Sequence, residues 1–328
     1  MRDLAGAKIR IAVPATISPN ALVGHDPAAP IVRLEGETMG TVWRVDLARP
    51  QALDIARLEA AIRSRLDGLV AEMSHWQETS LLCRFNRAPE GHWSSLPPDF
   101  ASVIAAALEV AEASGGAFDP AIGALVDLWG YGPPGAMPAP GAAAIAAARA
   151  RSGWRKIAFD RGGRRLRQPG GLQLDLSGIA KGYAVDALAE LLARKGVAHC
   201  LIEVGGELIG RGMRPDGDPW WVDLERPAPG IAPFRIALHD LAVATSGNYV
   251  RGDHTLDPAT GRPAANGVVS VSVIHGSAML ADAWASALTV LGAEKGLAMA
   301  EARGLAVRIV GDGGASEAIS SALRVMLG

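Results

Sequence analysis

The segment HCLIEVGGELIGRG, residues 199–212, decides the fold class, because two short apolar runs flank a pair of glycines in it. Short apolar runs separated by glycine are typical of neighbouring antiparallel strands. Three more apolar segments that predict strands follow: PWWVDLERP (219–227), FRIALHDLAVATSG (234–247) and GVVSVSVIHG (267–276). Because these strands are grouped rather than alternating strictly with helices, the sequence favours an α+β fold over a doubly wound parallel sheet.

Toward the N-terminus, IVRLEGETMGTVWRVDLA (31–48) alternates apolar and polar residues around two glycines, which predicts two strands joined by a turn. Residues 1–30 contain several prolines and no sustained period, so we expect an arm there, followed by one body over 31–328 that could comprise two intimate subdomains. Helices are predicted over 52–76, 99–116, 181–195 and 279–292, and two more are expected after Asp119–Pro120 and within the alanine-rich stretch 133–153. Two more strands are predicted, over 171–177 and 304–313.

The composition is that of a globular chain long enough to bury a sizeable core, with 328 residues, 49% of them hydrophobic. A formal net charge of -2 with interspersed signs indicates no surface for nucleic acid or an anionic membrane. Cys83 and Cys200 stand far apart, so we expect two buried thiols rather than a disulfide or zinc site. The chain as given shows no export signal, so we expect a cytoplasmic location, or a periplasmic one if such a signal was removed.

The first segment with candidate functional residues is LDLSGIAKGYAVDALAELL, residues 174–192. In it, Lys181 lies at the start of a predicted helix after a glycine turn. Free amides and the positive end of the helix dipole attract anions at such a place, and the lysine adds a charge. The pattern therefore suits a phosphate. An ordinary helix start with an exposed lysine fits the same pattern.

The second segment is MLADAWASALTVLG, residues 279–292, where Asp282 and Ser286 are four residues apart and share one face of a helix. An acid on a largely apolar helix lies at the solvent margin or is paired when it is buried. Magnesium bound by oxygen ligands is one such pairing.

The third segment is HTLDPATGRP, residues 254–263, a turn-rich loop that holds His254 close to Asp257. Histidine can accept a proton near neutral pH, and a neighbouring carboxylate can orient it. An exposed loop histidine next to an Asx-type turn is the alternative. Walker, Rossmann, HExxH and GxSxG motifs are absent, which removes the commonest nucleotide, zinc and serine-hydrolase interpretations.

Eight segments in this order resemble the FAD:protein FMN transferase family, known as ApbE. They are GETMGTVWRV, MSHWQETSLLCRFN, GGAFDPAIGALVDLWGYG, LDLSGIAKGYAVD, VGGELIGRG, ATSGNY, HTLDPATGRP and ADAWASALTVLG. The resemblance implies a T-fold-like architecture of mainly antiparallel sheets flanked by helices, with an FAD cleft. It further implies an enzyme that moves FMN from FAD onto a threonine or serine hydroxyl of a partner flavoprotein and releases AMP.

The site residues come from the same resemblance, position by position. The residues implied in FAD binding are Met39, Trp76, Ala117, Phe118, Asp119, Asp175, Lys181 and Leu256. Magnesium would be held by the carbonyl of Gly178, the carboxylate of Asp282, the hydroxyl of Ser286 and the carbonyl of Ala285, all hard oxygen ligands. His254 matches the family's catalytic base.

The sequence departs from the family pattern at several of these positions. Trp76 replaces a tyrosine and Ser286 a threonine, exchanges that keep an aromatic ring and a hydroxyl. Glu207 replaces an aspartate and Ala121 a threonine, and the stretch between Tyr249 and His254 is short, which bears on the acceptor groove. Two other functions remain open at this point: a metal-dependent FAD pyrophosphatase, and an FAD-binding protein without turnover.

Overall fold

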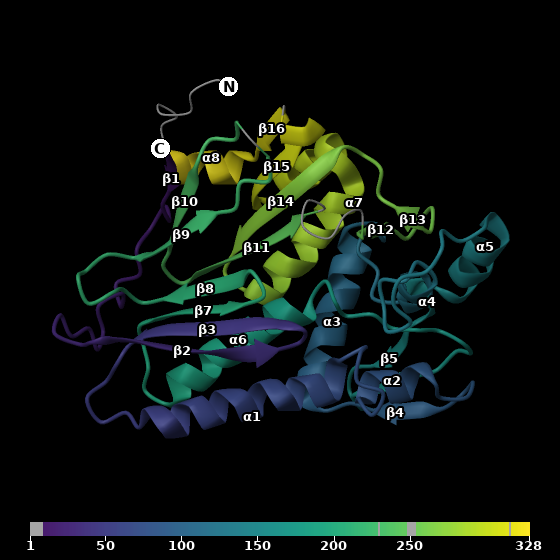
Figure 1. Cartoon of the computed structure of the whole chain (residues 1–328), viewed down its shortest axis with the longest axis horizontal. Helices are drawn as coiled ribbons and strands as arrows, with labels where there is room; N and C mark the ends of the chain where they lie inside the picture. Colours follow the sequence, from purple (N-terminus) through teal and green to yellow (C-terminus); the bar gives the residue numbers. More distant parts are fainter. Residues whose placement is uncertain (1–8, 229, 248–253, 315) are drawn as a thin grey trace.

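The alternating segments of the sequence form one central antiparallel sheet in the computed structural model, which describes residues 9–228, 230–247, 254–314 and 316–328. The sheet has eight strands (Figure 1). In spatial order they are β16 (Ser316–Ile319), β15 (Ala306–Gly311), β14 (Val268–His275), β11 (Leu241–Gly247), β8 (Glu207–Arg211), β7 (Cys200–Val204), β3 (Thr41–Ala48) and β2 (Ile31–Thr38). The predicted hairpin of residues 199–212 is the pair β7–β8, and residues 31–48 form β2–β3, so both expectations are confirmed.

Both faces of this sheet are covered. Successive side chains of a strand point to opposite faces, and Ile202 of β7 lies in the main core with the helices while its neighbour Leu201 lies in a second core. That second core is closed by a three-stranded sheet of β1 (Arg10–Ala12), β10 (Phe234–Leu238) and β9 (Trp220–Leu224). The arm expected over residues 1–30 therefore contributes a strand, because β1 pairs with β10.

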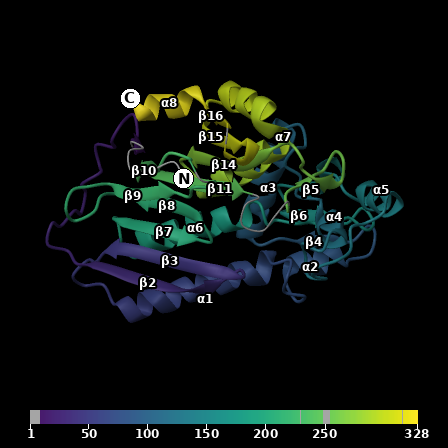
Figure 2. The ribbon, with the colours of Figure 1, turned by 45° about the horizontal axis from the view of Figure 1, so that its top comes forward.

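The helices cover the other face or gather at one end. The longest helices in the main core are α1 (Ile55–Met73), α3 (Pro98–Ala113), α6 (Ala180–Arg194) and α7 (Ala278–Arg303). Figures 1 and 2 both show a smaller unit at one end, made of α2 (Leu81–Asn86), α4 (Gly123–Leu128), α5 (Ala142–Arg151) and the strands β4 (Trp93–Ser95), β5 (Ala158–Asp160) and β6 (Arg165–Arg167). The remaining elements are α8 (Ser321–Leu327), the pair β12 (Leu256–Asp257) and β13 (Arg262–Pro263), and the 3-10 turns Trp154–Lys156 and Asp312–Gly314. Within the described residues, we find no helix with the length and apolarity needed to cross a bilayer.

Two sequence-based expectations need correction. The stretch 171–177 is not a strand, because its backbone groups bond to side chains and loops instead of a neighbouring strand. The Asn86 side chain donates to and accepts from Leu174 at 3.0 and 2.8 Å, and the amide of Asp175 donates to the carbonyl of Pro120. The helix predicted over 279–292 runs on to Arg303, past a non-helical residue at Gly292.

Helices α6 and α7 are held together at their N-terminal ends, and this contact positions the site described below. Asp186 of α6 accepts hydrogen bonds from the amides of Ala278 and Met279 and from the hydroxyl of Ser277, the residue that caps α7. One turn earlier, a Cβ on Gly182 would lie 2.2 Å from the carbonyl oxygen of Ala278. Only glycine lets the two backbones approach so closely.

A methyl group at this contact should separate the helices. We expect Gly182→Ala to lower the free energy of unfolding by about 2 kcal/mol, a typical cost of overpacking a core, as measured by urea denaturation. The control is Gly276→Ala, just before α7, where an added Cβ meets no atom within 4 Å. Equal stability of the two variants would contradict the close contact.

Candidate active site

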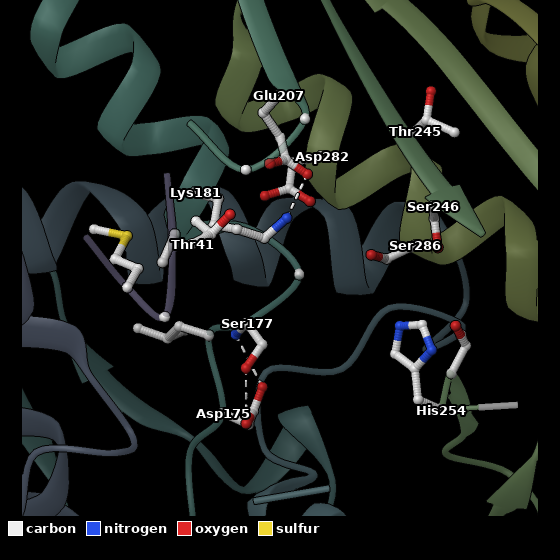
Figure 3. Close-up of a pocket in the computed structure, with 18 of the residues that line it drawn as sticks. Thr41, Asp175, Ser177, Lys181, Glu207, Thr245, Ser246, His254, Asp282 and Ser286 are labelled. Carbon is white, nitrogen blue, oxygen red and sulfur yellow. Dashed lines mark hydrogen bonds and ion pairs between the residues drawn. The ribbon is translucent and has the colours of Figure 1, made fainter. Parts of the chain in front are cut away.

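A cleft of about 1220 Å³ lies beside the N-terminal ends of α6 and α7 (Figure 3). Twelve of the thirteen residues singled out from the sequence line it: Met39, Trp76, Ala117, Phe118, Asp119, Asp175, Gly178, Lys181, His254, Leu256, Asp282 and Ser286. The thirteenth, Ala285, is not among the lining residues; it is 1% exposed, and its carbonyl accepts a hydrogen bond from the hydroxyl of Thr289 at 2.8 Å. The fold thus brings together segments that are far apart in the chain.

Three charged side chains from α6, β8 and α7 meet on one side of the cleft. The ammonium of Lys181 donates to Oε1 of Glu207 at 2.5 Å, and Oδ2 of Asp282 accepts the backbone amide of Gly182 at 3.0 Å. Figure 3 shows the carboxylates of Glu207 and Asp282 next to each other. Lys181 therefore lies where the sequence predicted, at the start of a helix, but it already has a carboxylate partner.

The charges in this cluster would not balance if both acids were ionised, because two buried carboxyl groups share one lysine. Burial, together with the charge of Asp282, raises the pKa of Glu207 to about 8, while Lys181 acts in the opposite direction. Burial also raises the pKa of Asp282. Oε2 of Glu207 is buried with no hydrogen-bond partner among the described residues. A cation bound here would let both acids ionise and would satisfy the free oxygen of Glu207.

The turn before α6 lies against α7 at Ser286. A Cβ on Gly178 would lie 2.8 Å from the hydroxyl oxygen of Ser286 and 3.3 Å from the ring of Phe118. Only a residue without a side chain leaves room for that hydroxyl beside the turn. Gly178 and Ser286 therefore lie against each other, and Asp282, one turn earlier on α7, lines the same cleft.

The mouth of the cleft carries apolar groups. Met39 sits in the two-residue turn of the β2–β3 hairpin with φ of 50°, a left-handed conformation that is uncommon for a residue other than glycine. Trp76 is 64% exposed, an unusual state for so large an apolar ring. An exposed indole at the edge of a cleft can stack on a planar ligand.

Asp119 has a structural role in addition to its place in the lining. Its two carboxylate oxygens accept the backbone amides of Ala121 and Trp154 at 2.8 and 3.0 Å. Burial raises its pKa to about 6 against the effect of these two bonds. The carboxylate thus fixes the loop that presents Ala117 and Phe118 to the cleft.

His254 lies across the cleft from Lys181, on the same side as Ser246 (Figure 3). Its loop is anchored on the smaller unit: Leu256 packs in a cluster with Leu125, and the carbonyl of Gly261 accepts the indole N–H of Trp129 at 2.8 Å. The carboxylate of Asp257 accepts the amide of Ala259 in an Asx-type turn. The short stretch after Tyr249, up to residue 253, lies outside the described residues.

The model of the ApbE family matches residues 39–309. This chain belongs to the ApbE family. It is 37% identical over 305 residues to the FAD:protein FMN transferase of Salmonella typhimurium, covering 87% of this chain and 85% of that protein, and 35% identical to its counterpart in Klebsiella pneumoniae, covering 89% and 87%. Among solved structures, the flavin transferase ApbE from Vibrio cholerae has a TM-score of 0.85 at 35% identity, covering 90% of this chain and 99% of that one. The apo form of Pseudomonas stutzeri flavinyl transferase ApbE has a TM-score of 0.86 at 36% identity, with coverage of 92% and 97%.

Membership of the ApbE family confirms the expected family, the α+β architecture with mainly antiparallel sheets, and the class of enzyme, a transferase. The roles of individual residues remain predictions. Among the described residues there is no group of three or more His, Cys, Asp and Glu side chains that could hold a metal. The magnesium ligands expected in this ApbE protein do not form such a cluster, because they are one carboxylate, one hydroxyl and backbone carbonyls.

Sequence reasoning missed two features of the site. Glu207 was noted only as a departure from the family pattern, whereas the structure makes it the partner of Lys181. His75 was not singled out, although it lines the cleft and contacts both Asp127 and Asp175. The one available signal was its position inside the segment MSHW, next to Trp76.

Proposed function

We propose that this protein is a magnesium-dependent FAD:protein FMN transferase, which attaches FMN through a phosphoester to a threonine or serine hydroxyl of a target flavoprotein and releases AMP. Relatives that align with most of the chain carry the name FAD:protein FMN transferase. The observation on which the proposal chiefly rests is the convergence of the Gly178 turn, Lys181 and the α7 residues Asp282 and Ser286 in one cleft large enough for a dinucleotide.

The donor set fits magnesium, because Asp282, Ser286 and the Gly178 carbonyl offer only oxygen, and the adjacent carboxyl group of Glu207 has a buried oxygen without a hydrogen-bond partner among the described residues. When bound, magnesium would neutralise charge on the diphosphate of FAD. Ala285 was expected as a fourth ligand through its carbonyl, which also accepts the Thr289 hydroxyl, and its role stays a prediction.

Other residues of the cleft would bind the phosphates and the flavin rings of FAD. Lys181, in the first turn of α6, would offer its charge to the phosphate oxygens. Trp76 and Met39 would contact the flavin rings at the mouth of the cleft. Packing around the cleft holds these groups in place, so that positioning supplies much of the rate.

The transfer itself is a displacement at the phosphorus of the FMN half. The acceptor hydroxyl oxygen forms a bond to that phosphorus, and its proton passes to the imidazole of His254. The bond from phosphorus to the bridging oxygen breaks, and AMP leaves with the electron pair. Negative charge grows on the leaving phosphate, where Lys181 stabilises it.

Lys181→Met should reduce kcat/KM for FAD by on the order of 100-fold, the usual loss for one stabilising donor. Steady-state transfer kinetics with varied FAD measure the effect. The matched control is Lys195→Met at the exposed other end of α6, which should retain wild-type kinetics. Equal activity of the two variants would remove Lys181 from the mechanism.

The proposed function is tested by incubating the protein with FAD, magnesium and a peptide that contains an acceptor threonine, followed by intact-mass analysis. A peptide heavier by one FMN phosphoester, together with free AMP, is the expected result. Free FMN and AMP with unmodified peptide would instead identify a pyrophosphatase, and unchanged FAD would identify a binding protein.

A further inference from the structure

A buried histidine in the wall of the cleft joins three separate segments. His75 follows the end of α1, Asp127 belongs to α4, and Asp175 precedes the turn into α6. Nδ1 of His75 lies 2.9 Å from Oδ2 of Asp175, and Nε2 lies 3.3 Å from Oδ1 of Asp127. The side chains of His75 and Asp175 are 8% and 7% exposed.

Both ring nitrogens of His75 face a carboxylate oxygen: Nδ1 is hydrogen-bonded to Asp175, and Nε2 is within ion-pair distance of Asp127. Two flanking carboxylates favour the protonated imidazole. Burial opposes this charge, but the bonds and charges of Asp127 and Asp175 outweigh it and raise the pKa of His75 to about 10. Burial would also penalise ionised Asp175, yet the hydrogen bond and charge of His75 lower the pKa of that carboxyl. The three groups form one ionic unit with a single cation between two anions.

This ionic unit is connected to the turn of residues 175–178, which leads into α6 and is proposed to lie at the diphosphate. The carboxylate of Asp175 also accepts the amide of Ser177 at 2.9 Å and its hydroxyl at 3.1 Å. Gly178 follows directly, and Lys181 lies in the first turn of the helix that begins there. On the other side, His75 is bonded in the chain to Trp76 at the mouth of the cleft. A shift of His75 would therefore move both ends of the site.

We propose that His75, held between Asp127 and Asp175, is a positioning residue for FAD: it fixes the turn from Asp175 to Gly178 against Trp76, so that the diphosphate and flavin sites keep their spacing. The inference rests on the proposed function for the identity of the ligand. His75 acts through Asp175 and Trp76, and it takes no part in the displacement.

The test measures FAD binding without acceptor or magnesium, by quenching of flavin fluorescence, in His75→Gln, Asp127→Asn and the double variant. His75→Gln should raise the Kd for FAD about tenfold, in the range found when groups supporting a binding site are removed. Since the two side chains act as one unit, Asp127→Asn should add no further loss in the His75→Gln background. With saturating FAD, magnesium and acceptor, kcat of His75→Gln should stay within about twofold of wild type.

A control separates positioning from general stability. Glu317→Gln removes a carboxylate that bonds Arg10 and Arg308 and does not line the cleft. It should lower the thermal unfolding midpoint and leave the FAD Kd unchanged. Asp127→Asn keeps an acceptor for His75 and provides a second folded variant if His75→Gln does not fold; alone it should raise the FAD Kd several-fold.

Three results would overturn the proposal: an unchanged FAD Kd in folded His75→Gln or Asp127→Asn, single losses that multiply in the double variant, or a loss confined to kcat. A wild-type protein that binds FAD but forms no FMN adduct would contradict the proposed transfer, while the dissociation constants would still decide the role of His75.

Discussion

Replacing Asp282 with asparagine should reduce magnesium-dependent transfer by about 10³-fold or more. This carboxylate is the only charged member of the proposed ligand set, and metal stabilisation of a charged transition state is worth several kcal/mol, or about three powers of ten in rate. Asparagine has the same shape and retains an oxygen to accept the amide of Gly182. The loss should therefore come from chemistry rather than from the fold.

Stability provides the check on that interpretation. Because the folded protein raises the pKa of Asp282 above its unfolded value, the ionised side chain at neutral pH opposes folding in the absence of a cation. The metal-free Asp282→Asn protein should thus unfold no earlier than wild type on heating. The control Glu294→Gln alters an exposed acid on the same helix and should match wild type in both assays. Full transfer by Asp282→Asn would refute its role as a ligand.

Replacing His254 with alanine should leave FAD binding within about twofold of wild type and lower kcat by 10² to 10⁴, the range for a general base. A threonine hydroxyl is a weak nucleophile whose proton must be removed during attack. His254 lines the cleft across from Lys181, so its loss should not disturb the diphosphate end. Single-turnover transfer at saturating FAD measures the effect, with the exposed His92→Ala as the control.

Two other outcomes for His254→Ala would each be informative. A large rise in the Kd for FAD would show that the histidine is a ligand contact. Transfer at the wild-type rate would mean that another group accepts the proton.

The elements that the sequence predicted well are those whose pattern is set by one buried face. Residues 31–48 and 199–212 alternate between two environments, and each formed the expected hairpin. The stretch 171–177 has a similar apolar pattern but is no strand, because the Asn86 side chain, from a distant helix, takes its backbone hydrogen bonds. Periodicity reports that a residue is buried and does not identify the partner of its backbone.

The same limit applies to the site. Lys181, Asp282 and His254 could be singled out, since their residue types and positions point to known chemistry. The pairing of Lys181 with Glu207 depends on how α6 lies against β8, and the pairing of His75 with Asp127 and Asp175 depends on contacts among three segments. Spacing along the chain carries no information on such contacts, so they needed the fold.

The most direct test of the account is a crystal of the protein soaked with FAD and manganese, an anomalous scatterer that accepts the same oxygen ligands as magnesium. The account predicts one anomalous peak next to Asp282, Ser286 and the carbonyl of Gly178, in contact with the diphosphate of FAD. An FAD-bound crystal with no peak there, or with the diphosphate away from these residues, would contradict it.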